Sequence, residues 1–278
     1  MPARLLVRVA ANVLAIALTV SSGDADAEGA RKVINAMAVT VFPPFEFADA
    51  SGNLVGFDID ILNGMASKMG TQVNWTQSTF AQIISFAPIK TARADILSSA
   101  LGDTPERRAS VNFIDYVYQP YVFYTLRANA ENFTNIETLC GKRVGAIRTS
   151  VIETGAVVKW SEENCTKAGK PAIIVVPGEN TPQVRLMVKQ GFADAGLTGA
   201  AIIAYQNTLE GNQYVVVGNP VIKLLTGMAF SKDDLQFAQE LKQALGALIA
   251  DGTYGQLLQK WGLPEDASIQ KPMVNGEP

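Results

Sequence analysis

The stretch DILSSALGDTPERRASVNF at residues 95–113 joins a strand, a helix start and a second strand. The apolar run at 94–98 predicts a buried strand. Thr104 and Pro105 then match the N-cap and the first helical position, where a hydroxyl acceptor and a residue without an N–H are favoured. Residues 110–114 predict a further strand. A strand–helix–strand unit of this kind predicts an α/β fold.

The same alternation continues on both sides of this stretch. Upstream, strands expected at 32–41 and 71–77 flank helices whose apolar residues recur every third or fourth position, at 57–69 and 80–87. Downstream, the pattern restarts after residue 126 and predicts two successive α/β units, and therefore two lobes. The expected elements there are strands at 143–147, 172–176, 193–197 and 214–217, an extended segment at 222–230, and helices from Ser150, from the cap Thr181, at 232–250 and at 254–261.

Two segments are predicted to lack regular structure. FPPFEF at 42–47 contains two prolines, which exclude it from a central strand, so we expect a loop at a strand end. The tail from Pro264 is polar and contains proline and glycine, which predicts a loose end.

The composition excludes several classes of protein. The chain has 278 residues, 48% of them hydrophobic, a net charge of −3, no histidine and two cysteines. Without histidine there is no Ser-His-Asp or Cys-His catalysis and no imidazole-ligated zinc or haem, and two cysteines cannot form a four-cysteine cluster. We therefore expect neither a metal nor a cofactor. A slightly acidic chain without charge runs is not typical of a nucleic-acid binder.

The N-terminus predicts a secretory signal peptide. Arg4 and Arg8 precede an apolar run at 9–20, and Ala-Asp-Ala at 25–27 is a small-x-small cleavage pattern. The run of 12 apolar residues is too short to span about 30 Å of hydrocarbon as a membrane anchor. We expect residues 1–27 to be removed and the mature protein to be soluble and periplasmic.

Export bears on the oxidation state of the two cysteines, Cys140 and Cys165. In an oxidising compartment an isolated pair of cysteines tends to form a disulfide. The alternative is two buried free thiols.

The order of several segments resembles the amino-acid-type (family 3) periplasmic solute-binding proteins of ABC importers. The matching stretches are FPPFEF at 42–47, GFDIDILNGMA at 56–66, DILSSALGDTPERRASVNF at 95–113, LCGKRVGAI at 139–147, GFADAGL at 191–197 and ADGTYGQLLQKWG at 250–262. They cover nearly the whole mature chain in one order.

The resemblance implies a type II periplasmic-binding-protein (Venus flytrap) fold, with two α/β lobes joined by two crossing strands and the ligand between them. The expected crossings are 121–126 and 224–230. The first lobe is then discontinuous, comprising 28–126 and 223–278, and the second lobe comprises 127–222. The implied partners are a small polar carboxylate, such as an amino acid or derivative, and the permease subunits of an ABC importer. We expect a monomer.

Arg107 is the foremost candidate for binding the ligand. A guanidinium holds a carboxylate through two parallel hydrogen bonds. A cation in the first helical turn opposes the helix dipole, so local stability does not favour arginine there. Arg107 also matches the carboxylate-binding arginine of the family. The alternative is a surface arginine paired with a nearby acid.

Two phenylalanines match the aromatic positions that enclose the ligand side chain in the family. Phe42 precedes the two prolines, and Phe80 begins a predicted helix. Aromatic faces desolvate a small ligand and attract cations. Phe80 also lies on an apolar helical face, so plain core packing is its alternative.

Backbone and hydroxyl contacts are expected from four further residues. Ser99 and Ala100 lie at a strand end, where ligands collect in α/β sheets. Thr149 and Ser150 precede a helix whose free N–H groups suit a carboxylate. Helix capping is a compatible role for Ser150.

The chain departs from the family at the ammonium-binding position. Family members usually carry an aspartate there, and the alignment through GFADAGLTG puts Gly199 in its place. Gly102, followed by Asp103, stands where a hydroxyl-bearing residue is usual, and Val151 replaces a frequent threonine.

Either another acid binds the ligand amine, or the ligand lacks a standard α-ammonium group. The candidate acids are Asp103, Glu46 and Glu179. An unpaired buried ammonium would be too costly to tolerate.

Three functions are compatible with this sequence, and we favour the first, which involves no enzymatic activity, over the other two. The first is a binding protein for transport. The second is an enzyme on the same scaffold, similar to dehydratases of cyclic carboxylates, with Glu179 or Asp103 as the general acid or base. The third is a binding protein that serves a sensor instead of an importer.

Overall fold

The computed structural model describes residues 31–264 and 267–278. The predicted signal peptide at 1–27 lies outside these residues. Residues 32–278 form one compact unit. In the described part of the chain, no helix has the length and apolar character needed to cross a membrane.

Nine strands form one mixed sheet. They span Val33–Ala38 (β1), Gln72–Gln77 (β5), Ile96–Gly102 (β6), Asn112–Leu126 (β7), Arg143–Ile147 (β8), Ile174–Gly178 (β9), Ala195–Gly199 (β10), Tyr214–Phe230 (β11) and Met273–Val274 (β12). The order is β5-β1-β6-β11-β7-β10-β8-β9, and β12 pairs with β7. The outer strands are parallel in two groups, β5-β1-β6 and β10-β8-β9, whereas β7 and β11 are antiparallel to their neighbours. This is the predicted α/β architecture.

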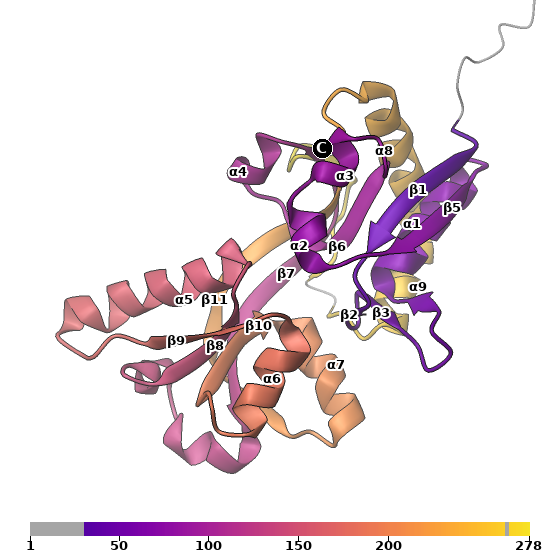
Figure 1. Ribbon diagram of the computed structural model, residues 1–278. Coiled ribbons are helices and arrows are strands. Elements are labelled where there is room, and N and C mark those ends of the chain that lie inside the picture. Colours follow the sequence, from indigo (N-terminus) through magenta and orange to yellow (C-terminus); the bar gives the residue numbers. More distant parts are fainter. Residues whose placement is uncertain (1–30, 265–266) are drawn as a thin grey trace, which may run out of the picture. The chain divides into compact units, whose positions relative to one another are not determined.

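Helices connect the parallel strands and cover the sheet (Figure 1). They span Phe57–Lys68 (α1), Phe80–Ile84 (α2), Ala87–Lys90 (α3), Pro105–Arg108 (α4), Val151–Asn164 (α5), Thr181–Lys189 (α6), Ala200–Glu210 (α7), Leu235–Ala250 (α8) and Thr253–Lys260 (α9). In α1 the predicted apolar face is buried, and Gly70 follows the helix with a φ of 70°, the left-handed conformation that favours glycine after a helix.

The first core joins the two ends of the described chain. Ile34 of β1, Phe57 of α1 and Leu241 of α8 belong to one buried cluster. On the other face of the sheet, Ile83 of α2 and Phe86 before α3 pack in a separate cluster. The discontinuous first lobe, 28–126 plus 223–278, remains our proposal, and this shared core supports it.

The second core is built from one continuous stretch. Phe123, Val144 and Leu197 pack with α5 on one face of the sheet. Val188 of α6 and Ile203 of α7 pack on the other face. These residues support the proposed second lobe, 127–222.

The strands β7 and β11 run side by side through both cores (Figure 1). Tyr121 pairs with Ile222 and Phe123 with Val217, and the register shifts between these two pairs. The predicted crossing segments 121–126 and 224–230 lie within the two strands. A register shift of this kind bends a strand pair locally.

The segment at 42–47 differs from its predicted loop. Val41–Phe42 (β2), Glu46–Ala48 (β3) and Leu54–Val55 (β4) form a small antiparallel sheet. The Pro43–Pro44 peptide bond is cis and lies in the turn between β2 and β3. Because a turn needs no ladder donor from these residues, the two prolines do not prevent the flanking strands from pairing.

The tail and one helix cap also differ from the sequence expectation. The tail is not loose: Ile269 is buried, β12 pairs with β7, and Asn275 Oδ1 accepts a hydrogen bond from Phe113 N at 2.9 Å. The cap of α6 is Asn180 instead of Thr181, because Asn180 Oδ1 accepts the N–H of Gln183 at 2.9 Å.

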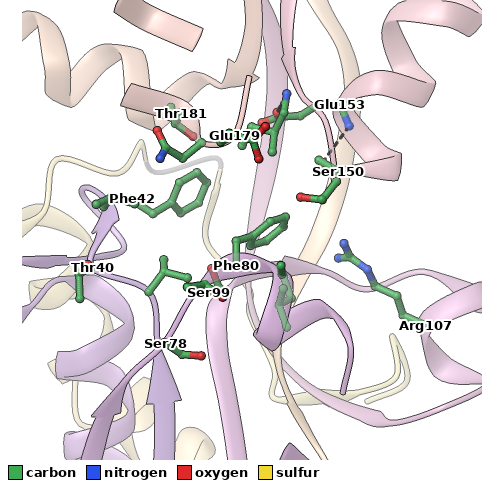
Figure 2. Close-up of a pocket in the computed structure, with 18 of the residues that line it drawn as sticks. Thr40, Phe42, Ser78, Phe80, Ser99, Arg107, Ser150, Glu153, Glu179 and Thr181 are labelled. Carbon is green, nitrogen blue, oxygen red and sulfur yellow. Dashed lines mark hydrogen bonds between the residues drawn. The ribbon is translucent and has the colours of Figure 1, made fainter. Parts of the chain in front are cut away.

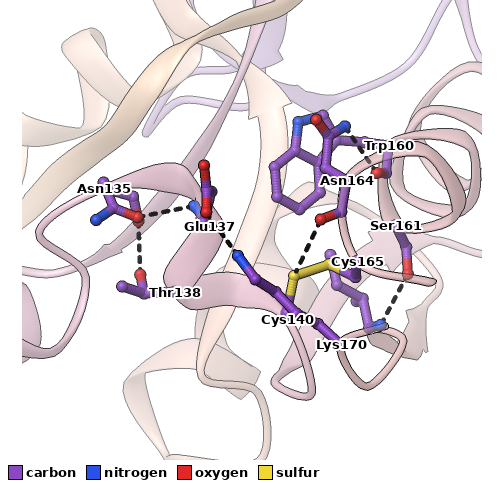
Figure 3. Close-up of a disulfide and its surroundings, with 10 residues drawn as sticks. Asn135, Glu137, Thr138, Cys140, Trp160, Ser161, Asn164, Cys165 and Lys170 are labelled. Carbon is purple, nitrogen blue, oxygen red and sulfur yellow. Dashed lines mark hydrogen bonds and ion pairs between the residues drawn. A yellow bond between two sulfur atoms is a disulfide. The ribbon is translucent and has the colours of Figure 1, made fainter. Parts of the chain in front are cut away.

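The predicted disulfide between Cys140 and Cys165 is confirmed (Figure 3). Cys165 is the residue that ends α5, and the Cα atoms of the two cysteines are 5.5 Å apart. Beside the disulfide, Lys170 forms an ion pair with Glu137 at 2.6 Å. The bond therefore ties the far end of α5 to the segment before β8.

Candidate functional site

A cleft of about 410 Å³ lies between residues of the two proposed lobes. Figure 2 shows Phe42, Phe80 and Arg107 on one side of it, and Ser150 and Glu153 on the other. Of the candidates from the sequence, the structure brings seven together in its lining: Phe42, Phe80, Ser99, Arg107, Thr149, Ser150 and Glu179.

Arg107 is held in the cleft by α4 and the end of β6. Thr104 Oγ1 accepts the N–H of Arg107 at 3.3 Å, and Arg107 Nη1 donates to the carbonyl of Gly102 at 2.8 Å. The side chain is largely buried, with the residue 8% exposed, and burial lowers the pKa of the guanidinium below its ordinary value.

No ion pair neutralises Arg107 within residues 31–264 and 267–278. This arrangement does not match the alternative of a surface arginine paired with a nearby acid. An arginine keeps its charge at neutral pH, so its remaining donors are available to a ligand anion.

Aromatic rings line the wall beside Arg107. Phe42 stacks on Phe45 with ring centroids 5.8 Å apart, and Phe80 begins α2, whose N-cap is Thr79. Both Phe42 and Phe80 are half-buried, so part of each ring faces the cleft while part packs on the core. The buried Tyr121 of β7, which the sequence did not indicate, also lines the cleft.

Glu153 is a lining residue that sequence reasoning missed. It lies in the first turn of α5, is 3% exposed, and accepts the N–H of Ile147 on Oε2 at 3.1 Å. Thr198 of β10 lies beside the same carboxyl group. Burial raises the pKa of Glu153 to about 8. The pattern S-x-x-E at 150–153 could have indicated it, as a capping box.

The other polar groups of the second wall differ in exposure and in hydrogen bonding. Ser150 Oγ accepts the N–H of Glu153 at 3.2 Å and caps α5, and Thr149 is exposed. The Glu179 side chain is 62% exposed and pairs with Arg148 at 3.1 Å. The buried hydroxyl of Thr181 has no hydrogen-bond partner among the described residues.

Three predicted ligand contacts next to Arg107 do not line the cleft. The N–H of Ala100 donates to Asp58 Oδ2 at 3.0 Å, and the carbonyl of Gly102 accepts from Arg107. Asp103 accepts a hydrogen bond from Arg108 Nε at 2.5 Å, and its side chain is fully buried in that ion pair. Asp103 is therefore not available to a ligand amine in the cleft.

Glu46 lies beneath the cleft beside another carboxyl group, that of Asp58. Burial raises the pKa of both residues, and their mutual proximity raises that of Glu46 further. Asp58 accepts from Tyr116 Oη at 2.6 Å and Ser98 Oγ at 2.8 Å, so it is the member that holds the negative charge. Burial and the charge of Asp58 therefore favour the neutral form of Glu46, and Ser99, which lines the cleft, lies beside it.

Gly199 has no room for a side chain. A Cβ atom built on it would lie 2.0 Å from Gln119 Nε2. The buried Gln119 side chain of β7 therefore fills the space into which a larger residue at 199 would point.

No group of three or more histidine, cysteine, aspartate or glutamate side chains in the described ranges could hold a metal ion. The cleft instead offers one buried cation, one buried carboxyl group, aromatic faces and hydroxyl groups. This set suits a small polar organic ligand better than an ion.

Comparisons with known proteins agree with this geometry. The chain is 28% identical over 248 residues to an arginine-binding protein of Corynebacterium glutamicum, covering 89% of this chain and 80% of that protein. It is 28% identical over 229 residues to the lysine/arginine/ornithine-binding periplasmic protein of Escherichia coli, covering 80% and 84%.

A solved structure of similar fold is an ancestral amino acid-binding protein, described as a precursor of cyclohexadienyl dehydratase. The TM-score is 0.69 at 27% identity, and the match covers 83% of this chain and 95% of that one. The architecture is the expected type II periplasmic-binding-protein fold. Residues 34–264 match one family over most of the chain, and the protein belongs to the bacterial extracellular solute-binding proteins, family 3.

Proposed function

We propose that this solute-binding protein captures an amino acid, or a closely related small polar carboxylate, in the cleft. The observation that carries the proposal is Arg107, a buried guanidinium without an acidic partner among the described residues. Leaving a buried charge unpaired is costly, and a ligand carboxylate satisfies it with two charge-assisted hydrogen bonds. The names of the relatives, which bind arginine, lysine or ornithine, support an amino-acid ligand.

Capture couples to closure because both walls contribute to the site. Arg107 and Phe80 belong to the first lobe, and Ser150 to the second. Only a ligand that contacts both lobes binds the closed arrangement better than the open one, and so shifts the population toward it. We propose that the closed, loaded form of a monomer is what the permease of an ABC importer recognises in the periplasm, after removal of residues 1–27. A receptor that senses the ligand is the alternative partner.

We propose no catalytic step. Glu179 is exposed and ion-paired, and Asp103 is buried against Arg108, so neither acid considered for catalysis is poised in the cleft. The competing function is a dehydratase, and what favours it is the buried carboxyl group of Glu153 with its raised pKa, as a general acid requires. Loss of water from a bound carboxylate during incubation would establish that competing function.

The test is to identify the compound that the protein retains on purification. The protein is denatured, the released compound is identified by mass spectrometry, and its affinity for ligand-free protein is measured by calorimetry. We expect a small carboxylate, recovered chemically unchanged after incubation. Small-angle scattering should show a smaller radius of gyration when it is bound. A retained compound without a carboxylate, or an unchanged radius at saturation, contradicts the proposal.

A further inference from the structure

We propose that Glu153 binds the ammonium group of the ligand whose carboxylate Arg107 binds, so that the cleft selects zwitterions. This inference rests on the proposed function. It names a residue for recognition of the amine and excludes simple carboxylates as good ligands.

The two groups lie on opposite walls of one cleft. Arg107 comes from α4 in the first lobe and Glu153 from α5 in the second (Figure 2). Tyr121 lines the same cleft, and burial raises its pKa, with Glu153 raising it further and Arg107 lowering it. A ligand that contacts Arg107 at one end and Glu153 at the other therefore carries a negative and a positive group.

Helix capping does not account for burying a carboxyl group at this place. In a capping box, the glutamate side chain accepts the N–H of the cap residue. Here the N–H of Ser150 donates to the carbonyl of Ile147 at 3.0 Å, and Glu153 Oε2 accepts the N–H of Ile147 instead. A neutral glutamine could accept that same hydrogen bond, so the contact does not require an acid.

Glu153 is almost fully buried, with 3% of the residue exposed. No cation in the described ranges forms an ion pair with it. A buried carboxyl group is costly in its charged form unless a positive group joins it. Without ligand the group is held neutral, since burial raises its pKa to about 8. An ammonium group in the cleft would supply the missing charge and favour the carboxylate form.

The other candidate acids are not available to a ligand amine in the cleft. Glu179 pairs with Arg148 at the solvent, Asp103 pairs with Arg108, and Glu46 is buried beside Asp58 outside the cleft lining. Position 199 cannot contribute a side chain, because Gln119 occupies the space. Thr198, the residue before Gly199, lies beside Glu153. Glu153 is therefore the acidic side chain at this end of the cleft.

The test compares Glu153→Gln with the matched control Glu162→Gln. Both glutamates belong to α5, but only Glu153 is buried and lines the cleft, whereas Glu162 is exposed and lies outside the cleft lining. The probes are the twenty standard L-amino acids and their des-amino carboxylic acids, in which hydrogen replaces the ammonium group. Wild type and both variants are titrated by calorimetry, and circular dichroism confirms their fold.

We expect Glu153→Gln to lower the affinity for the amino acid that wild type binds best by at least about 30-fold, because a charge-assisted contact becomes a neutral one. Glu162→Gln should stay within about threefold of wild type, because its exposed side chain lies outside the cleft lining. The matching des-amino acid should bind wild type at least about 30-fold more weakly than the amino acid does, and should bind Glu153→Gln as well as it binds wild type.

Three results overturn the inference, and they differ in what they leave standing. If Glu153→Gln binds the amino acid within about threefold of wild type, Glu153 is not the amine partner and capture of amino acids stands. If wild type binds des-amino acids as tightly as amino acids, the cleft does not select zwitterions and capture of carboxylates stands. This second comparison needs no variant, so it decides even if Glu153→Gln fails to fold. If neither class of probe binds, the proposed function fails and the inference fails with it.

Discussion

The helix starts on the two walls of the cleft have the same local geometry and opposite charges. In α4, the hydroxyl of Thr104 accepts the N–H of Arg107, and in α5, the hydroxyl of Ser150 accepts the N–H of Glu153. Each cap thus fixes a residue three positions later whose side chain lines the cleft. The helix dipole favours Glu153 at this position and disfavours Arg107. The comparison teaches that the helix start favours an acid at position 153 without accounting for its burial, and opposes a cation at position 107, so each residue calls for a role in binding.

The two helices also differ in how they are held. The four residues of α4 lie between β6 and β7, and Arg107 of this helix is buried and donates to the carbonyl of Gly102. The fourteen residues of α5 run from the cleft to Cys165, where the disulfide holds the far end. Substitutions on the two walls should therefore change binding affinity and fold stability to different extents. Four predictions test this difference.

The largest effect is expected from Arg107→Ala. The variant leaves the ligand carboxylate without its bidentate partner in a desolvated cleft, which costs on the order of 2–5 kcal/mol of binding free energy. Calorimetry with the identified ligand measures this loss. Arg108→Ala is the matched control, because Arg108 follows on the same helix but contacts Asp103 instead of the cleft. Binding by Arg107→Ala within about threefold of wild type would remove Arg107 from the site.

Removal of the disulfide should lower the stability of the second lobe without affecting binding. Cys140 and Cys165 are 25 residues apart, and the chain-entropy estimate for a loop of this size is about 3.5 kcal/mol. Urea unfolding of the Cys140→Ala/Cys165→Ala variant measures this change, and titration should give an affinity within about twofold of wild type. A loss of affinity as large as the loss of stability would mean that the cleft end of α5 depends on the disulfide.

The pH dependence of the free energy of unfolding should reveal the protonation state of Glu153 in the folded protein. The carboxyl group has a pKa of about 8 in the folded protein against 4.5 as its ordinary value, so the folded state binds the extra proton between these values. Wild type should therefore lose stability relative to Glu153→Gln as pH rises from 4.5 to 8, by about 4 kcal/mol.

Urea unfolding of both proteins without ligand, at pH 5 and pH 8.5, measures this difference. The groups that face Glu153 are Thr198 of β10, the backbone of β8, and Tyr121 and Tyr124 of β7, whose pKa values burial raises. The tyrosines therefore stay neutral over this range. If the stability of the two proteins depends on pH in the same way, Glu153 is ionised in the ligand-free folded protein and the prediction is wrong.

The smallest effect is expected at Gly199. Gly199→Ala forces the end of the Gln119 side chain to move, and overpacking of this kind costs about 1–2 kcal/mol. A double-mutant cycle with Gln119→Ala tests the contact, because removing Gln119 should relieve the clash and give non-additive unfolding free energies. Additive losses would show that Gln119 does not fill this space.

The fold could be predicted further than the site. Apolar periodicity and turn residues indicated most strands and helices, because these patterns reflect burial along one element. The β2–β3 pairing and the docked tail escaped detection, since both depend on partners distant in sequence. Arg107 could be identified from its local misfit at a helix start together with the family resemblance.

The amine side of the site could not be predicted in the same way. Glu153 has a common structural explanation as part of a capping box, so its pattern did not stand out. Asp103 and Glu46 were plausible from charge alone, and only their contacts with Arg108 and Asp58 remove them from the cleft. The space at Gly199 depends on Gln119, a residue 80 positions away by their numbering, and no single-sequence pattern connects the two.

The discontinuous first core has a consequence for the order in which the chain can fold. Ile34 and Phe57 pack against residues of α8, which emerge from the ribosome only after the whole of 127–222 has been made. The continuous stretch around Val144 and Leu197 has its packing partners within residues 123–217 and can condense before the last helices are made. The N-terminal segment must wait, with its apolar side chains uncovered, until the last helices arrive. A chain truncated before α8 should therefore retain a folded middle and expose the side chains of α1.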